Sequence, residues 1–122
     1  DPEVYALNLS HEYDRKSKER IRIFAIDHAQ ENNKPVKTSI KKKSVIFEKM
    51  YYRVKDNDSG RIIFGFGEND NSTRISIDGS GMFFDFHFDV LPFGRTYTFE
   101  YLVVNKNVRQ IIKDKRARFS VK

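Results

Sequence analysis

One stretch of the sequence constrains the fold more strongly than any other, because its side chains alternate strictly between apolar and polar. From Phe84 to Asp89, phenylalanine occupies every second position, at 84, 86 and 88, and aspartate or histidine occupies positions 85, 87 and 89. Successive side chains of a β-strand point to opposite faces, whereas an α-helix would spread the same rings around its circumference. The pattern therefore predicts a strand with one face in a core and the other in solvent.

Similar alternation recurs along the chain. The sequence has 11 Phe and 6 Tyr, residue types that favour the pleated surface of a sheet. Turn-forming clusters such as Asp56 to Gly60 and Asp78 to Gly81 separate the alternating segments. We expect strands that include residues 5–9, 21–26, 50–54, 61–66, 74–77, 82–89, 97–103 and 117–121, with a charged connection at 105–115. That connection could hold a short helix or a hairpin near Val108 to Ile112.

These segments predict an all-β fold, an antiparallel β-sandwich of about seven to eight strands, with an open barrel as the rival architecture. The 122 residues are enough for a single domain spanning residues 1–122. Because the sequence begins with Asp1 rather than Met, we expect either that processing has removed a segment or that the domain is a module of a longer chain. In the core we expect one set of side chains to face another across the sandwich. The first set is Phe84, Phe86, Phe88, Tyr97, Phe99 and Tyr101, and the second is Ile21, Ile23, Tyr52, Val54, Ile75 and Ile77.

Composition and motifs argue against several classes of protein. The absence of cysteine excludes disulfides, thiolate metal sites and cysteine nucleophiles. No apolar run approaches about 18 residues, so no membrane partner is expected. The sequence has no Gly-x-Ser-x-Gly elbow, HExxH motif or P-loop, and we therefore expect neither an enzyme nor a cofactor.

Three groups of polar residues could still hold a metal. Asp85, His87 and Asp89 share one face of their predicted strand, and two loops, 56–60 and 68–71, are rich in oxygen ligands. We interpret the first group as the solvated face opposite the phenylalanines. The two loops are interpreted as turns in which Asp or Asn side chains bond the local backbone.

The segment from Leu91 to Tyr97 resembles the tyrosine corner of immunoglobulin-like and fibronectin-type sandwiches, in which a Leu and a Gly precede a strand-opening Tyr. The resemblance identifies Leu91, Gly94 and Tyr97 as the corner residues. It implies that the Tyr97 hydroxyl bonds the backbone of the connection between the two sheets. Phe99 stands where antibody domains carry Cys, and the chain has no Trp, so the resemblance is to the wider sandwich class.

A second resemblance extends from Tyr51 to Val121. Residues 51–56, 62–66, 73–78, 81–84 and 91–97 are similar to sandwich modules in structural proteins of tailed-bacteriophage particles. The resemblance implies a non-enzymatic structural or interaction module of a virion, in the tail, baseplate, neck or capsid decoration. Its partners would then be other virion proteins, arranged in many symmetric copies. A bacterial adhesin or carbohydrate-binding sandwich, at the cell surface or outside the cell, is the alternative.

The net charge of +6 points to a surface that meets an acidic partner. Two basic clusters could form that surface, one of Lys41, Lys42 and Lys43 and the other of Arg109, Lys113, Lys115, Arg116 and Arg118. If the clusters converge, they would attract a phosphate backbone without reading sequence, which makes nucleic-acid binding an alternative function. Because the aromatic side chains are predicted to point inward, they would not be available to stack on bases. Acidic protein neighbours are the other class of partner that such a patch would suit.

Overall fold

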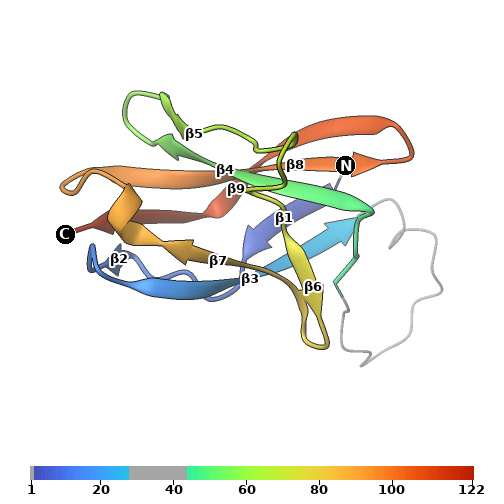
Figure 1. Cartoon of the computed structure of the whole chain (residues 1–122), viewed down its shortest axis with the longest axis horizontal. Helices are drawn as coiled ribbons and strands as arrows, with labels where there is room; N and C mark the ends of the chain where they lie inside the picture. The colour runs from blue at the N-terminus through green and yellow to red at the C-terminus, as the bar shows by residue number, and fades with distance from the viewer. Residues whose placement is uncertain (1, 28–43) are drawn as a thin grey trace.

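The computed structural model describes residues 2–27 and 44–122, and this part of the chain forms nine β-strands (Figure 1). The strands are β1 (Pro2–Ala6), β2 (Glu12–Tyr13), β3 (Lys18–Asp27), β4 (Lys49–Asp56), β5 (Ile62–Phe64), β6 (Ser76–Asp78), β7 (Gly81–His87), β8 (Thr96–Asn105) and β9 (Val108–Val121). A short 3-10 turn, η1 (Phe88–Val90), follows β7. The predicted all-β class is confirmed. The strand number exceeds seven to eight because of β2, whose two residues are too few to produce an alternation.

The strands form two sheets, with the orders β1-β3-β7-β6 and β2-β9-β8-β4-β5. Figure 1 shows them as two layers, with β4, β8 and β9 above and β3 and β7 below. Every pair is antiparallel except β2 with β9, where Glu12 lies opposite Ser120 and Tyr13 opposite Val121 in a parallel register. The expectation of a purely antiparallel fold is therefore wrong at this edge. After β1 has paired with β3 in the first sheet, residues 7–11 carry the chain to the second sheet, where β2 runs beside β9.

A core of aromatic side chains fills the space between the sheets. The six aromatic residues predicted for it, at positions 84, 86, 88, 97, 99 and 101, are at most 3% exposed. Tyr52 stacks on Phe84 with ring centroids 4.0 Å apart, and the edge of Phe99 meets Phe84 at 5.2 Å and Phe86 at 5.6 Å. Burial of each large apolar side chain contributes about 1.5–3 kcal/mol to folding, so this cluster is the main source of stability.

The predicted division of the core between the layers is partly wrong. Tyr52 and Val54 on β4 lie in the same sheet as β8, so they neighbour the β8 rings rather than facing them. Ile77, which we expected to be buried, is 53% exposed because it lies on β6, a three-residue strand at the edge of its sheet. Strand alternation predicts which residues share a face, but it does not say which strands share a sheet.

The segment predicted as a charged connection is in fact the second strand of a hairpin. β8 turns into β9 at Lys106 and Asn107, whose φ angles are 50° and 68°, and β9 then continues for 14 residues. The pairing between β8 and β9 is regular up to Lys113 and resumes at Arg118, with extra β9 residues between them that interrupt the alternation.

This irregularity in β9 connects the two sheets. Asp114, which is 2% exposed, accepts a hydrogen bond from the Ala6 N–H of β1 at 2.8 Å and another from the Tyr101 hydroxyl at 2.7 Å. Burial raises the pKa of Tyr101 well above its usual value, as does the adjacent Asp114 carboxylate, so the phenol remains the donor. The buried carboxylate thereby fastens the end of β1 to the sheet opposite its own.

Candidate binding surface

The three residues assigned to the tyrosine corner lie together where the chain crosses from β7 to β8. Tyr97 is fully buried, and its hydroxyl donates a hydrogen bond to the Pro92 carbonyl. Leu91 is 4% exposed, and Gly94 has a φ of 81° that favours glycine, with its N–H bonded to the Val121 carbonyl at 2.8 Å. Burial raises the pKa of Tyr97, which keeps its hydroxyl protonated as a donor. These residues hold a connection between sheets and expose no reactive group.

The polar residues considered for metal binding are engaged in other contacts or lie apart. Asp85 and His87 share the outer face of β7, whereas Asp89 lies in η1. Arg20 binds the Asp85 carboxylate through Nε at 2.8 Å and Nη2 at 3.0 Å, and this pairing lowers the pKa of Asp85. In the described part of the chain, no group of three or more His, Asp or Glu side chains could hold a metal ion.

The two oxygen-rich loops form the local turns that their sequence predicts. Asp56 Oδ1 accepts the N–H groups of Asp58 and Ser59 at 3.0 and 3.1 Å, and Asp70 Oδ1 accepts the Ser72 N–H at 2.9 Å. The second Asp56 oxygen is bound by Arg95. Both aspartates therefore bond to groups of the protein itself.

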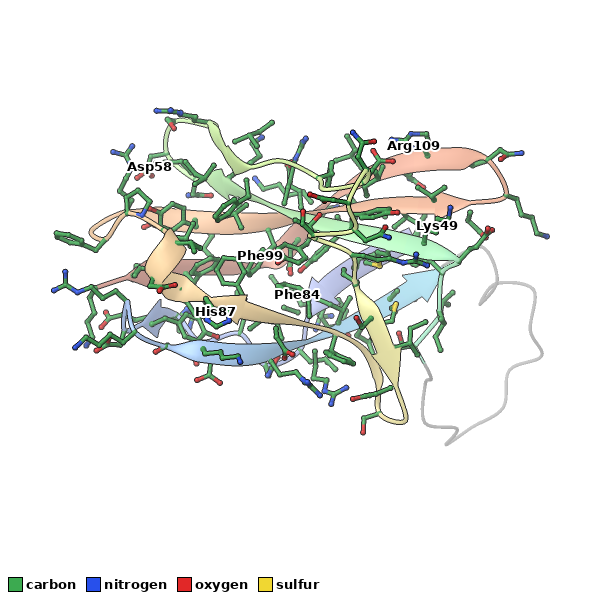
Figure 2. The ribbon with its side chains drawn as sticks, viewed as in Figure 1. Lys49, Asp58, Phe84, His87, Phe99 and Arg109 are labelled. Carbon is green, nitrogen blue, oxygen red and sulfur yellow. The ribbon has the colours of Figure 1, made fainter. Side chains whose placement is uncertain are left out.

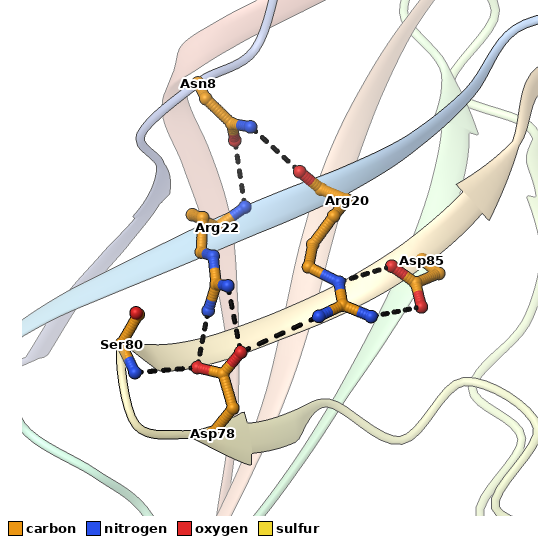
Figure 3. Close-up of polar contacts among 6 residues, drawn as sticks. All are labelled: Asn8, Arg20, Arg22, Asp78, Ser80 and Asp85. Atoms are coloured by element: carbon orange, nitrogen blue, oxygen red, sulfur yellow. Dashed lines mark hydrogen bonds and ion pairs between the residues drawn. The ribbon is translucent and has the colours of Figure 1, made fainter.

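The outer face of the four-stranded sheet carries a cluster of four charged residues, which we call the Arg–Asp network: Arg20, Arg22, Asp78 and Asp85 (Figure 3). Arg22 binds Asp78 through both terminal nitrogens at 2.7 and 2.9 Å, and Arg20 Nη1 lies 3.7 Å from the same carboxylate. Chiefly because of the Arg22 hydrogen bonds, the pKa of Asp78 falls to about 2. Two cations and two carboxylates balance, so this network presents no net charge.

The outer face of the five-stranded sheet has a very different charge. Residues paired directly across neighbouring strands point to the same face, and on this face β4 and β9 each contribute three cations. We call this surface the basic face, and its cations are Lys49, Arg53 and Lys55 of β4 and Arg109, Lys113 and Arg118 of β9. The two columns of cations flank β8, whose outward residues Thr98, Glu100 and Leu102 are 3%, 7% and 3% exposed.

Two carboxylates contact three of the six cations of the basic face. Glu100 accepts a 2.7 Å hydrogen bond from Arg53 Nε and lies 3.6 Å from Lys55 Nζ. Glu68 accepts two hydrogen bonds from Arg109 at 2.6 and 2.7 Å, an interaction that lowers the pKa of Glu68. Among residues 2–27 and 44–122, no carboxylate forms an ion pair with the three remaining cations, Lys49, Lys113 and Arg118. The face therefore keeps a surplus of positive charge.

The loop between β5 and β6, residues 65–75, covers one end of the basic face. The Arg53 guanidinium lies 4.7 Å from the Phe66 ring centroid, the Tyr51 hydroxyl lies 3.4 Å from Asn71 Oδ1, and Glu68 reaches Arg109. These three contacts are made by outward-facing residues of β4 and β9, so the loop crosses above β8. Figure 2 shows Arg109 and Lys49 toward the same end of the sheet. The end that carries Lys55, Lys113 and Arg118 is left open.

The structure reorganises the predicted basic patch. It brings Arg109, Lys113 and Arg118 together on the basic face, but Arg116 turns toward the other sheet, where its guanidinium lies 3.7 Å from the Tyr5 ring. Lys115 is exposed within the irregular part of β9. Lys41, Lys42 and Lys43 lie outside the described residues.

The three cations of β4 were not predicted from the sequence. A signal was present, because Lys49, Tyr51, Arg53 and Lys55 occupy alternate positions, but the predicted strand of residues 50–54 ended before Lys55 and began after Lys49. Only the pairing of β4 and β9 with the same central strand shows that the two sets of cations belong to one surface.

In residues 2–27 and 44–122, no helix is both long enough and apolar enough to cross a membrane. The chain matches no family model, and comparison with curated proteins and with solved structures found no match.

Proposed function

We propose that this protein is an immunoglobulin-like β-sandwich that serves as a non-enzymatic structural or interaction module of a larger assembly, and that the assembly is a tailed-phage virion. The observation that carries the fold assignment is the strand order. Immunoglobulin-type sandwiches arrange their strands as A-B-E-D in one sheet and G-F-C, with C′ beside C, in the other. If β1, β3, β6 and β7 are strands A, B, D and E, then β4, β5, β8 and β9 are C, C′, F and G.

The tyrosine corner supports the same assignment. In immunoglobulin-like domains this residue lies near the start of strand F and bonds the backbone a few residues upstream. Tyr97 lies near the start of β8, which is F in this order, and bonds the carbonyl of Pro92. Two independent features, one of topology and one of a side chain, thus agree with the proposed fold.

The non-enzymatic role is supported by what the carboxylates contact. Asp56, Asp78 and Asp85 are each bound by an arginine, which keeps them as anions and uses their lone pairs. Glu100 is bound by Arg53 in the same manner. These four carboxylates therefore stabilise the fold instead of acting as general acids or bases. Since fold alone does not decide function, this is the chemical argument for a binding module.

The proposal is tested by locating the protein. An antibody raised against the purified domain would be applied to phage particles purified on a density gradient and to intact bacteria, with immunogold electron microscopy as the measurement. We expect regular labelling of one part of the particle, such as the tail or the capsid. Labelling of the bacterial surface alone would favour the adhesin alternative, and recovery of the protein only as a free species would contradict an assembly role.

A further inference from the structure

We infer that the open end of the basic face binds the phosphate backbone of single-stranded nucleic acid without reading its sequence. The inference is independent of the proposed assembly, because it depends only on the charge and shape of one sheet face. The cations concerned are Lys55 of β4 and Lys113 and Arg118 of β9.

The first argument is the linear arrangement of the charges. Lys55 and Arg118 are both in register with Thr98, and Arg53 and Lys113 are both in register with Glu100. Neighbouring strands lie about 4.8 Å apart, so the two columns of cations are separated by roughly 10 Å across β8. Thr98 and Glu100 between them are only 3% and 7% exposed, and Arg53 and Lys55 both contact Glu100, so positive charge extends along both sides of β8. This strip along β8 suits a single linear polyanion.

The second argument is the covered end. The loop of residues 65–75 rises over the sheet and is held to β9 by Glu68 and Arg109. A rigid duplex, or a broad acidic protein surface, laid on the strip would meet this loop. A flexible single strand can follow the open strip and turn aside before the loop.

The third argument is the availability of the charges. Lys113 and Arg118 are exposed, and within the described part of the chain neither is in an ion pair. Each can therefore approach a phosphate without first breaking a salt bridge. Two exposed aliphatic residues border the strip, Ile62 beside Lys55 at 46% and Ile111 two residues from Lys113 at 53%, where they could contact sugars and bases. The one aromatic side chain of β4 that points to this face, Tyr51, is 4% exposed, so phosphate contacts rather than base stacking should dominate.

The direct test is fluorescence anisotropy with a labelled 20-nucleotide oligo(dT) and the full chain. Three phosphate contacts predict that log K falls with log salt with a slope of about −2.1, which is about an eighteen-fold loss of affinity between 50 and 200 mM salt. The double variant Lys113→Glu, Arg118→Glu should abolish measurable binding. The matched control Lys16→Glu, Lys18→Glu changes the net charge equally but alters the loop before β3 and the first residue of β3, and it should retain most of the affinity.

A second pair of measurements keeps the test decisive if charge reversal harms folding. The neutral variant Lys113→Gln, Arg118→Gln should bind with a salt slope reduced to about −0.7, because two of the three contacts are lost. Equal binding by this variant and the unaltered protein would place the site elsewhere and overturn the inference. It would also be overturned if poly-L-glutamate of matched charge displaced oligo(dT) as well as oligo(dT) itself, which would indicate an acidic polypeptide partner, or if duplex DNA bound more tightly. None of these results bears on immunogold labelling of particles, so the two proposals can fail separately.

Discussion

The two outer faces of this protein are both rich in arginine and lysine, yet their cations are paired with carboxylates to different extents. On the four-stranded sheet, Arg20 and Arg22 meet two aspartates that lie on the neighbouring strand β7 and at the end of β6 (Figure 3). On the five-stranded sheet, six cations of β4 and β9 flank a central strand that offers them one carboxylate, Glu100, and the β5–β6 loop offers a second, Glu68.

This difference shows that the number of cations on one strand does not determine the net charge of the sheet face to which that strand belongs. What matters is the strand that lies beside it and the register in which the two pair. Arg20 is directly opposite Asp85, so the two charges meet, whereas Lys113 is opposite a glutamate that already contacts Arg53 and Lys55. Cross-strand neighbours decide whether a charge is neutralised or left for a partner.

The largest expected effect comes from the core that both faces share. Phe86 is 3% exposed and meets the rings of Phe88 at 5.0 Å and Phe99 at 5.6 Å. Phe86→Ala should lower the free energy of unfolding by about 3–5 kcal/mol, measured by urea denaturation. Ile77→Ala is the control, since this residue is 53% exposed and should cost far less. If both substitutions lowered the free energy of unfolding equally, Phe86 would not belong to the core between the two sheets.

The next effect concerns the connection that joins the two layers. Tyr97→Phe removes the hydroxyl that bonds the Pro92 carbonyl and should lower the free energy of unfolding by about 1 kcal/mol. Tyr51→Phe is the matched control, because its hydroxyl makes only a long 3.4 Å contact with Asn71. The same denaturation measurement applies to both. If Tyr51→Phe lowers the free energy of unfolding as much as Tyr97→Phe does, the hydrogen bond from Tyr97 to Pro92 makes no special contribution to stability.

The Arg–Asp network should make one face sensitive to acid. In the folded protein the pKa of Asp78 is lowered to about 2 from its ordinary value near 4. The ionised carboxylate therefore contributes stability above pH 4, and this contribution is lost as the pH falls from about 4 toward 2. Asp78→Asn should melt at a lower temperature at neutral pH and should lose part of the decline seen in the unaltered protein between pH 4 and 2. Parallel melting curves of the two proteins across that range would contradict a role for the pair in folding.

The smallest effect on stability is expected on the basic face. Lys113→Gln together with Arg118→Gln should change the free energy of unfolding by no more than about 0.5 kcal/mol, because exposed side chains outside any ion pair contribute little to folding. Arg22→Gln on the opposite face provides the comparison, since it removes the partner of Asp78 and should lower the melting temperature further. If the Lys113 and Arg118 substitutions greatly lowered the free energy of unfolding, both faces would contribute to stability. That result would contradict the contrast between them.

Much of the local structure could be predicted from the sequence alone. The alternation at positions 84, 86 and 88 and at 97, 99 and 101 predicts both the strands and the burial of the rings, because a strand directs every second side chain to the same face. The turn at Asp56 to Gly60 was predicted for a similar reason, since Asp side chains accept hydrogen bonds from the next few N–H groups. These are properties of neighbours along the chain.

Only the tertiary structure decided which strands lie side by side. The parallel pairing of β2 with β9, the exposure of Ile77 and the joining of Lys55 with Arg118 across Thr98 all depend on contacts between residues far apart in sequence. Alternation has a period of two in every strand and does not depend on which strand lies alongside. It could therefore predict which residues share a face, but not which strands share a sheet. The charge of a face depends on several strands together. The surplus on the basic face arises because β4 and β9 both pair with β8.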